Sequence, residues 1–205
     1  VHATVDPYPF SEPGSVEALN NRGNVLRQLD RFEEALASCD KALAIEPDFV
    51  DAFTIRGTIL LEMDRPEAAL ASYDRALTIK PDYLDALCLR GGVLLSSFKR
   101  PQEAIADLEK VLAIKPDREY ALGMLADAKM HCANWGNRQE EFERIAEGVR
   151  CGKRSVSPFL FLAMSDSAAD QIQCARIWVC DKYPAAPTPI WRGEQYRHER
   201  IRVAY

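Results

Sequence analysis

The sequence predicts an all-α solenoid, in which helix–turn–helix units stack into a right-handed superhelix. Small residues recur at a spacing of 34 or 35 residues, and apolar residues within each unit recur at helical spacing. A period of this length is typical of repeat proteins, whose units bury their apolar faces only against each other. We expect a helical extension after the repeats and a short strand at the end of the chain.

Five columns of residues define the repeat. They are Ala18, Ala52 and Ala86; Gly23, Gly57 and Gly91; Ala35, Ala69 and Ala104; Ala42, Ala76 and Val111; and Pro47, Pro81 and Pro116. The single extra residue of the third unit falls between Gly91 and Pro101. Because loops tolerate insertions better than helices do, we place it in the turn between the two helices of that unit.

Each unit is predicted to contain two helices. The second helix of the first unit has one apolar stripe, formed by Phe32, Ala35, Leu36, Cys39, Ala42 and Leu43. Asp30 and Asp64 stand where an N-cap of the second helix would lie. Asp48, which follows the closing proline, is expected to cap the next helix, as are its equivalents Asp82 and Asp117.

The repeated glycines and alanines predict close contact between the two helices of a unit. Glycine inside a helix costs about 1 kcal/mol relative to alanine. Three such glycines, Gly23, Gly57 and Gly91, are explained if a side chain at these positions would clash with the partner helix.

These features resemble tetratricopeptide (TPR) repeats. The resemblance covers three full units over residues 16–117, followed by the first helix of a fourth unit at 118–132 and a divergent, cap-like helix at 137–150. The chain is accordingly divided into an N-terminal tail (1–15), a solenoid (16–133), a helical cap or junction (134–182), a proline-rich linker (183–199) and a terminal strand (200–205).

The resemblance implies that the first helices line an inner groove that binds proteins or extended peptides. The groove candidates are Asn20, Asn21, Asn24, Arg27, Thr54, Ile55, Thr58 and Leu89. The asparagine amides could hold a peptide backbone, since each carries two donors and an acceptor. The alternative is an ordinary solvated helix face.

Two known types of TPR groove fit poorly. Clamps for the C-terminal carboxylates of chaperones need several cations, but Asp51, Asp85, Ile55 and Leu89 stand at those positions. Such a lining repels a carboxylate. The asparagine ladder of O-GlcNAc transferases is represented by Asn21 alone.

A second recurring pattern predicts an ionic ladder between stacked helices. Its cations are Arg22, Arg56 and Arg90, and its carboxylates are Asp40, Asp74 and Glu109. The ladder would fix the register of the units rather than add much stability. Alternatively, the arginines extend along apolar surface to reach solvent.

The segment after the repeats resembles the junction of bacterial O-GlcNAc-transferase-like glycosyltransferases. The similarity covers residues 130–205 and is carried by "NW", "VSPF", "LAMSD", "CAR" and "WRGEQYRHERIRVAY", in that order. It implies a parent protein that transfers N-acetylglucosamine from UDP-GlcNAc to Ser or Thr of proteins, with the GT-B catalytic domain outside this chain. Neither His131 nor His198 is assigned a catalytic role.

The last residues alternate as in a strand. Because a single strand cannot pair its own backbone groups, it implies a sheet of an absent domain. In this chain we expect the strand to pack on another molecule, including a second copy of the chain, or on the chain's own helices. The alternative to a glycosyltransferase fragment is a free-standing TPR scaffold.

Composition limits the classes of partner, compartment and cofactor that fit this chain. The net charge of −5 and the pI near 5.3, without a Lys/Arg block, argue against nucleic acid or an anionic membrane as the main partner. No signal-peptide pattern is present, and the six cysteines are expected to be mostly buried free thiols in a reducing cytoplasm. No metal-ligand spacing or cofactor motif occurs, so we expect no catalytic residue, no metal and no cofactor.

Overall fold

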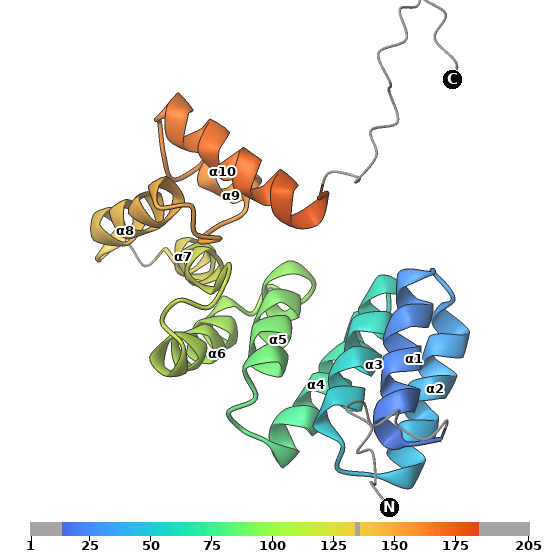
Figure 1. The fold of residues 1–205 in the computed structure, drawn as a ribbon. Coiled ribbons are helices and arrows are strands. Elements are labelled where there is room, and N and C mark those ends of the chain that lie inside the picture. The colour runs from blue at the N-terminus through green and yellow to red at the C-terminus, as the bar shows by residue number, and fades with distance from the viewer. Residues whose placement is uncertain (1–13, 134–135, 185–205) are drawn as a thin grey trace, which may run out of the picture.

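The computed structural model describes residues 14–133 and 136–184, and within these ranges the chain is all-helical (Figure 1). The helices are α1 (Val16–Gln28), α2 (Phe32–Ile45), α3 (Val50–Glu62), α4 (Pro66–Ile79), α5 (Leu84–Ser96), α6 (Pro101–Ile114), α7 (Ala121–His131), α8 (Arg138–Arg150), α9 (Pro158–Phe161) and α10 (Ala168–Lys182). The predicted strand at 200–205 and nearly all of the linker lie outside the described residues.

The first six helices form three similar pairs that stack along the solenoid. Every first helix has 13 residues and every second helix has 14. The loop inside a pair has three residues in the first two units (29–31 and 63–65) and four in the third (97–100). The extra residue therefore lies in the turn where the sequence placed it, and both helices of the third unit keep their length.

The two aspartates expected to start the second helices instead end the first ones. Asp30 and Asp64 have φ of 56°, in the left-handed region. The amide of Asp30 donates to the carbonyl of Arg27, and the amide of Arg31 donates to that of Leu26. This is a Schellman ending of α1. The N-cap prediction was wrong because aspartate tolerates the left-handed conformation as well as it caps.

The aspartates after the closing prolines do not cap either. The N-cap of α3 is Phe49 and that of α5 is Tyr83, and neither helix has a side-chain cap. Asp48 and Asp82 lie one residue too early, in the turn before the N-cap.

Small residues allow close helix contact, as the sequence predicted. A Cβ on Gly23 would lie 2.9 Å from Cys39 Sγ, and one on Gly57 would lie 2.5 Å from Tyr73 Cε1. Gly91 has more room, since its nearest neighbour, Leu108 Cγ, would be at 3.4 Å. The facing alanines of the second helices are fully buried; they are Ala35, Ala69 and Ala104.

The fourth unit departs from the repeat where α7 begins. Tyr120 adopts φ of 61°, its amide donates to the carbonyl of Arg154 at 2.6 Å, and the amide of Gly123 donates to that of Ser155 at 3.0 Å. The segment before α9 thus packs on the start of α7. The end of α10 is joined to the same place, because the Tyr120 hydroxyl donates to Asp181 at 2.8 Å.

A separate apolar cluster holds the C-terminal helices to α7. Its buried members are Ala126, Ile145, Ala146, Val149, Val156, Phe161 and Cys174. Helices α8 and α9 therefore pack against α7, and α10 packs on α8 and α9, at the yellow-to-red end of the chain in Figure 1. No helix in the described part of the chain is long and apolar enough to span a membrane.

The cysteines are free, but their burial differs from the expectation. Cys39 and Cys174 are buried, Cys88 and Cys132 are intermediate, and Cys151 and Cys180 are exposed. Burial, with a smaller effect of the neighbouring Asp40, raises the pKa of the Cys39 thiol to about 11.

We therefore expect iodoacetamide at neutral pH to alkylate Cys151 and Cys180 in the folded protein. Cys39 should react only after denaturation, because it is inaccessible and its thiolate is scarce. Mass spectrometry of tryptic peptides over a time course measures each site. Equal rates at Cys39 and Cys180 would contradict the described packing.

Candidate functional site

The first helices form the concave side of the solenoid. Among the described helices, α1 contacts α3, α3 contacts α5 and α5 contacts α7, whereas α2, α4 and α6 do not contact one another. In a curved stack, the layer whose helices lie closer together is on the inside of the curve. Here that layer is formed by the first helices of the units. Groove residues should therefore come from α1, α3, α5 and α7.

Only some of the predicted groove residues are accessible. Asn20 and Thr54 are 7% exposed. The Thr54 hydroxyl donates to the carbonyl of Val50, while Asn20 Oδ1 has no partner. These two residues belong to the interior, because their column turns toward the second helices. Asn21, by contrast, is exposed.

A polar network joins the C-terminal ends of α1 and α3. Arg27 donates to Asn24 Oδ1 at 3.1 Å and to Glu62 at 2.6 Å. Thr58 donates to the carbonyl of Thr54 and lies 3.3 Å from the Tyr73 hydroxyl. Both Arg27 and Asn24 are thus occupied within the protein. Glu62 was not among the residues predicted from the sequence, although it lies 35 residues after Arg27, about one repeat away.

An apolar column runs along the middle of the same surface. Ile55 and Leu89 are half-buried and lie one repeat apart, and Met124 continues the column on α7. Ile55 packs on the cluster around Ile59, and Leu89 on the cluster around Val93. Each therefore has a fixed position while part of its side chain remains open to solvent.

The two aspartates at the edge of the groove, Asp51 and Asp85, have partners from the next unit. Asp51 accepts a 2.5 Å bond from the Tyr83 hydroxyl, and Asp85 forms an ion pair with Arg118. Burial, and then the bond to Asp51, raises the pKa of the Tyr83 phenol. Tyr83 and Arg118 were not predicted from the sequence, because they stand at different positions of the repeat from the aspartates they contact.

Two of the recurring arginines bridge successive units. Arg56 Nε lies 3.0 Å from Asp40 Oδ1, and Arg90 Nη1 lies 2.7 Å from Asp74 Oδ1. Each arginine also donates to the second helix of its own unit: Arg56 to Ser72 at 2.8 Å, and Arg90 to both oxygens of Asp107 at 2.6 and 2.8 Å. The column that contains Ser72 and Asp107 was not singled out in the sequence.

The ends of this ladder differ from the prediction. Arg22 has no carboxylate among the described residues and donates only to Ser38, at 3.2 Å. Glu109 is approached by Lys129 at 3.8 Å instead of by an arginine. The register explains this, since no unit precedes Arg22 in the described chain and the residue one repeat after Arg90 is Leu125.

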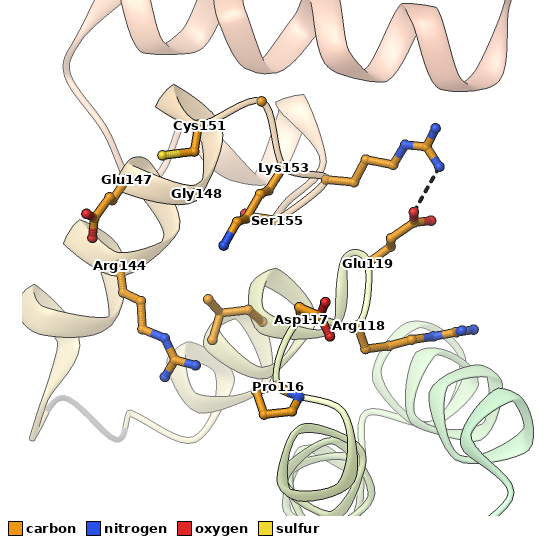
Figure 2. A pocket seen from close by; sticks show the side chains of 13 residues that line it. Pro116, Asp117, Arg118, Glu119, Arg144, Glu147, Gly148, Cys151, Lys153 and Ser155 are labelled. Atoms are coloured by element: carbon orange, nitrogen blue, oxygen red, sulfur yellow. Dashed lines mark hydrogen bonds and ion pairs between the residues drawn. The ribbon is translucent and has the colours of Figure 1, made fainter.

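The largest pocket described lies beyond the repeats, between the α6–α7 turn and α8 (Figure 2). It encloses about 620 Å³. Figure 2 shows the side chains of Arg144 and Lys153 extending into it, opposite Asp117, with the Glu119–Arg154 ion pair at its rim. The charged residues that line this pocket come from segments distant in sequence, so no local sequence motif predicts the pocket.

A second pocket, of about 580 Å³, is mostly apolar. It lies between the end of α7 and α9, where Phe159 is 87% exposed and Leu162 is 57% exposed. Within residues 14–133 and 136–184, no cluster of three or more His, Cys, Asp or Glu side chains could hold a metal ion.

The repeat geometry agrees with comparisons to known proteins. Sequence models of the tetratricopeptide repeat match residues 16–49 and 56–119. These units are tetratricopeptide repeats. The TPR matches cover the three described pairs except for residues 50–55 at the start of α3, and they end at the turn before α7, where the structure departs from the repeat.

Solved structures with similar folds are also TPR proteins. One from Parabacteroides merdae has a TM-score of 0.63 and 22% identity, covering 82% of this chain and 66% of its own. The first TPR of Spaghetti (RPAP3), bound to an HSP90 peptide, has a TM-score of 0.56 and 21% identity over 58% of this chain and 96% of its own. YrrB, described as having an unusual peptide-binding site, has a TM-score of 0.56 and 19% identity over 83% of this chain and 79% of its own. No curated protein matches the chain.

Proposed function

We propose that this chain binds proteins or extended peptides on the concave side of its TPR solenoid. The observation that supports the proposal best is the apolar column of Ile55 and Leu89, continued by Met124, on adjacent first helices. A row of partly open apolar side chains at a regular spacing suits the side chains of an extended segment laid along the groove. Asn21 at the α1 end supplies a free amide for its backbone.

The preferred ligand is apolar or cationic rather than acidic. The Spaghetti (RPAP3) TPR was solved with the HSP90 peptide SRMEEVD, which has three carboxylate side chains and a terminal carboxylate. Here Asp51 and Asp85 line the acidic edge of the groove, and Arg27 is already paired with Glu62. A carboxylate-rich tail would therefore meet the carboxylates of Asp51 and Asp85, and Arg27 could compensate for them only by leaving Glu62.

A phage-displayed library of random dodecapeptides tests this function. Binders should be depleted in Asp and Glu, and the double variant I55D/L89D should weaken the best one at least about tenfold, because apolar anchors in a groove carry most of the affinity. V179D is the matched control, since Val179 on α10 is 51% exposed and distant in the fold from α3 and α5. Selection of acidic peptides, or equal loss in both variants, would refute the proposal; circular dichroism verifies that each variant is folded.

We also propose, from the sequence resemblance of residues 130–205, that the chain is the TPR and junction region of an O-GlcNAc-transferase-like glycosyltransferase. In that arrangement the solenoid positions protein substrates for chemistry done elsewhere. The test is sugar transfer from UDP-GlcNAc by the full natural protein, which should occur, compared with residues 1–205 alone, which should be inactive. A natural protein without a sheet-rich catalytic domain would favour the free-standing scaffold.

A further inference from the structure

The apolar column of the groove has one member per helix pair. Ile55, Leu89 and Met124 stand on α3, α5 and α7, one repeat apart, and all three are half-buried. Cα atoms of adjacent first helices come within 8 Å of one another, and the axes of packed helices lie about 8–10 Å apart. A ligand that crosses the first helices along the column therefore meets an apolar contact about every 9 Å.

The polyproline II conformation places side chains on one face at this interval. It has three residues per turn and a rise of about 3.1 Å, so residues i, i+3 and i+6 share a face and lie about 9.3 Å apart. In a β-strand the side chains alternate, and residues on one face lie about 6.8 Å or about 13.6 Å apart. A strand therefore does not match the period of the column, whereas a polyproline II segment does.

The edge of the groove repeats with the same period. Asp51 and Asp85 each lie four residues before a member of the apolar column, and so next to it on the helix surface. Asp51 is bonded to an uncharged hydroxyl, that of Tyr83, whereas Asp85 is paired with Arg118. In a polyproline II segment the residues that follow the apolar ones also share a face. One segment can thus place a basic residue near Asp51 while its apolar residues contact the column.

The two steps of the column differ in rigidity. Ile55 and Leu89 are held by the clusters on which they pack. Met124 instead extends toward α5, because a Cβ on Gly92 would lie 3.4 Å from Met124 Cε. A methionine side chain adapts readily to its contacts. Selection for spacing should therefore be strongest at Ile55 and Leu89 and weaker at Met124.

We propose that the groove selects a polyproline II segment with an apolar residue at every third position and a basic residue among the intervening ones. This inference rests on the proposed peptide-binding function, and it adds the conformation and the sequence pattern of the ligand. Proline suits the intervening positions, because it holds the backbone near the bound conformation beforehand and so lowers the entropy lost on binding.

Nine-residue peptides of one composition test the spacing. Each contains three leucines, three prolines and three lysines, carries fluorescein at its N-terminus, and has leucine at every second, every third or every fourth position. Fluorescence polarisation with the 205-residue chain should show the tightest binding for every third position, by at least about tenfold. In polyproline II the other two peptides place only one leucine on each face, and apolar anchors carry most of the affinity.

A second set of peptides with alanine in place of proline tests the conformation. Alanine permits a strand or a helix as well as polyproline II. The preference for leucine at every third position should remain in this set. The best peptide should bind about threefold to tenfold more weakly than its proline counterpart, because it is less ordered before binding.

Variants of the chain locate the contact. L89A should weaken the best peptide about tenfold and M124A about threefold. V179D on α10 is the control and should leave the affinity unchanged, since Val179 is 51% exposed and outside the groove. In L89A the advantage of the three-residue spacing should largely disappear, which a loss of unspecific apolar contact would not cause.

Four results would overturn the pattern. They are tightest binding with leucine at every second position, as for a strand; tightest binding at every fourth position in the alanine set, as for a helix; equal affinity for all spacings; and no binding by any peptide up to its solubility limit. The phage selection separates this inference from the function. Selected peptides that weaken in I55D/L89D but lack the three-residue period leave the function standing and refute the pattern, whereas selection of no groove binder refutes the function itself.

Discussion

Replacing Arg90 with alanine is expected to lower the free energy of unfolding by about 3 to 5 kcal/mol, the range for breaking a buried ion pair from one side. Asp107 is only 6% exposed, and both of its oxygens accept from Arg90. Removing the guanidinium leaves a buried carboxylate without its cation and also releases Asp74 of the preceding unit. Urea unfolding followed by circular dichroism measures the loss.

Two further variants separate the charge effect from simple truncation. R22A should cost no more than about 0.5 kcal/mol, because this exposed arginine has only a serine partner. R90M/D107L should recover most of the stability lost in R90A, since an apolar pair of similar volume removes the uncompensated charge. If R90A and R22A were equally stable, the buried pair would contribute nothing.

Replacing Gly57 with alanine is expected to destabilise the protein, whereas the same change at Gly91 should stabilise it. At Gly57 the new methyl would meet the ring of Tyr73, which is fully buried and whose hydroxyl lies 3.3 Å from Thr58. Overpacking costs about 1 to 3 kcal/mol, against a gain of about 1 kcal/mol in helix propensity. At Gly91 the facing Leu108 is in ordinary contact distance, so the gain of up to about 1 kcal/mol remains.

Thermal and urea unfolding of the two variants provide the comparison. The double variant G57A/Y73L copies the arrangement of the third unit and should recover part of the loss in G57A. Equal stability of G57A and G91A would show that the tyrosine ring moves aside without cost.

Features that each unit repeats could be predicted from the sequence, whereas features set by the backbone conformation or by contacts between units could not. Gly57 and Ala69 revealed close helix contact because the same requirement is repeated in each unit. Asp30 was misassigned, because aspartate suits both an N-cap and a left-handed helix ending, and only the backbone conformation distinguishes them. Asn20 was predicted to line the groove, but it is buried, whereas its neighbour Asn21 is exposed. Successive residues of a helix face different directions, and the sequence alone does not say which of the two faces solvent.

The sequence by itself determined that this chain is a stack of helix pairs with a period of 34 or 35 residues, where one pair ends and the next begins, and where its insertion lies. Local helical periodicity and a period repeated three times carry that information. The tertiary structure alone decided which arginines pair with carboxylates and which groove residues stay open to solvent. These features depend on contacts between residues of adjacent units, and such contacts cannot be read from one repeated position alone.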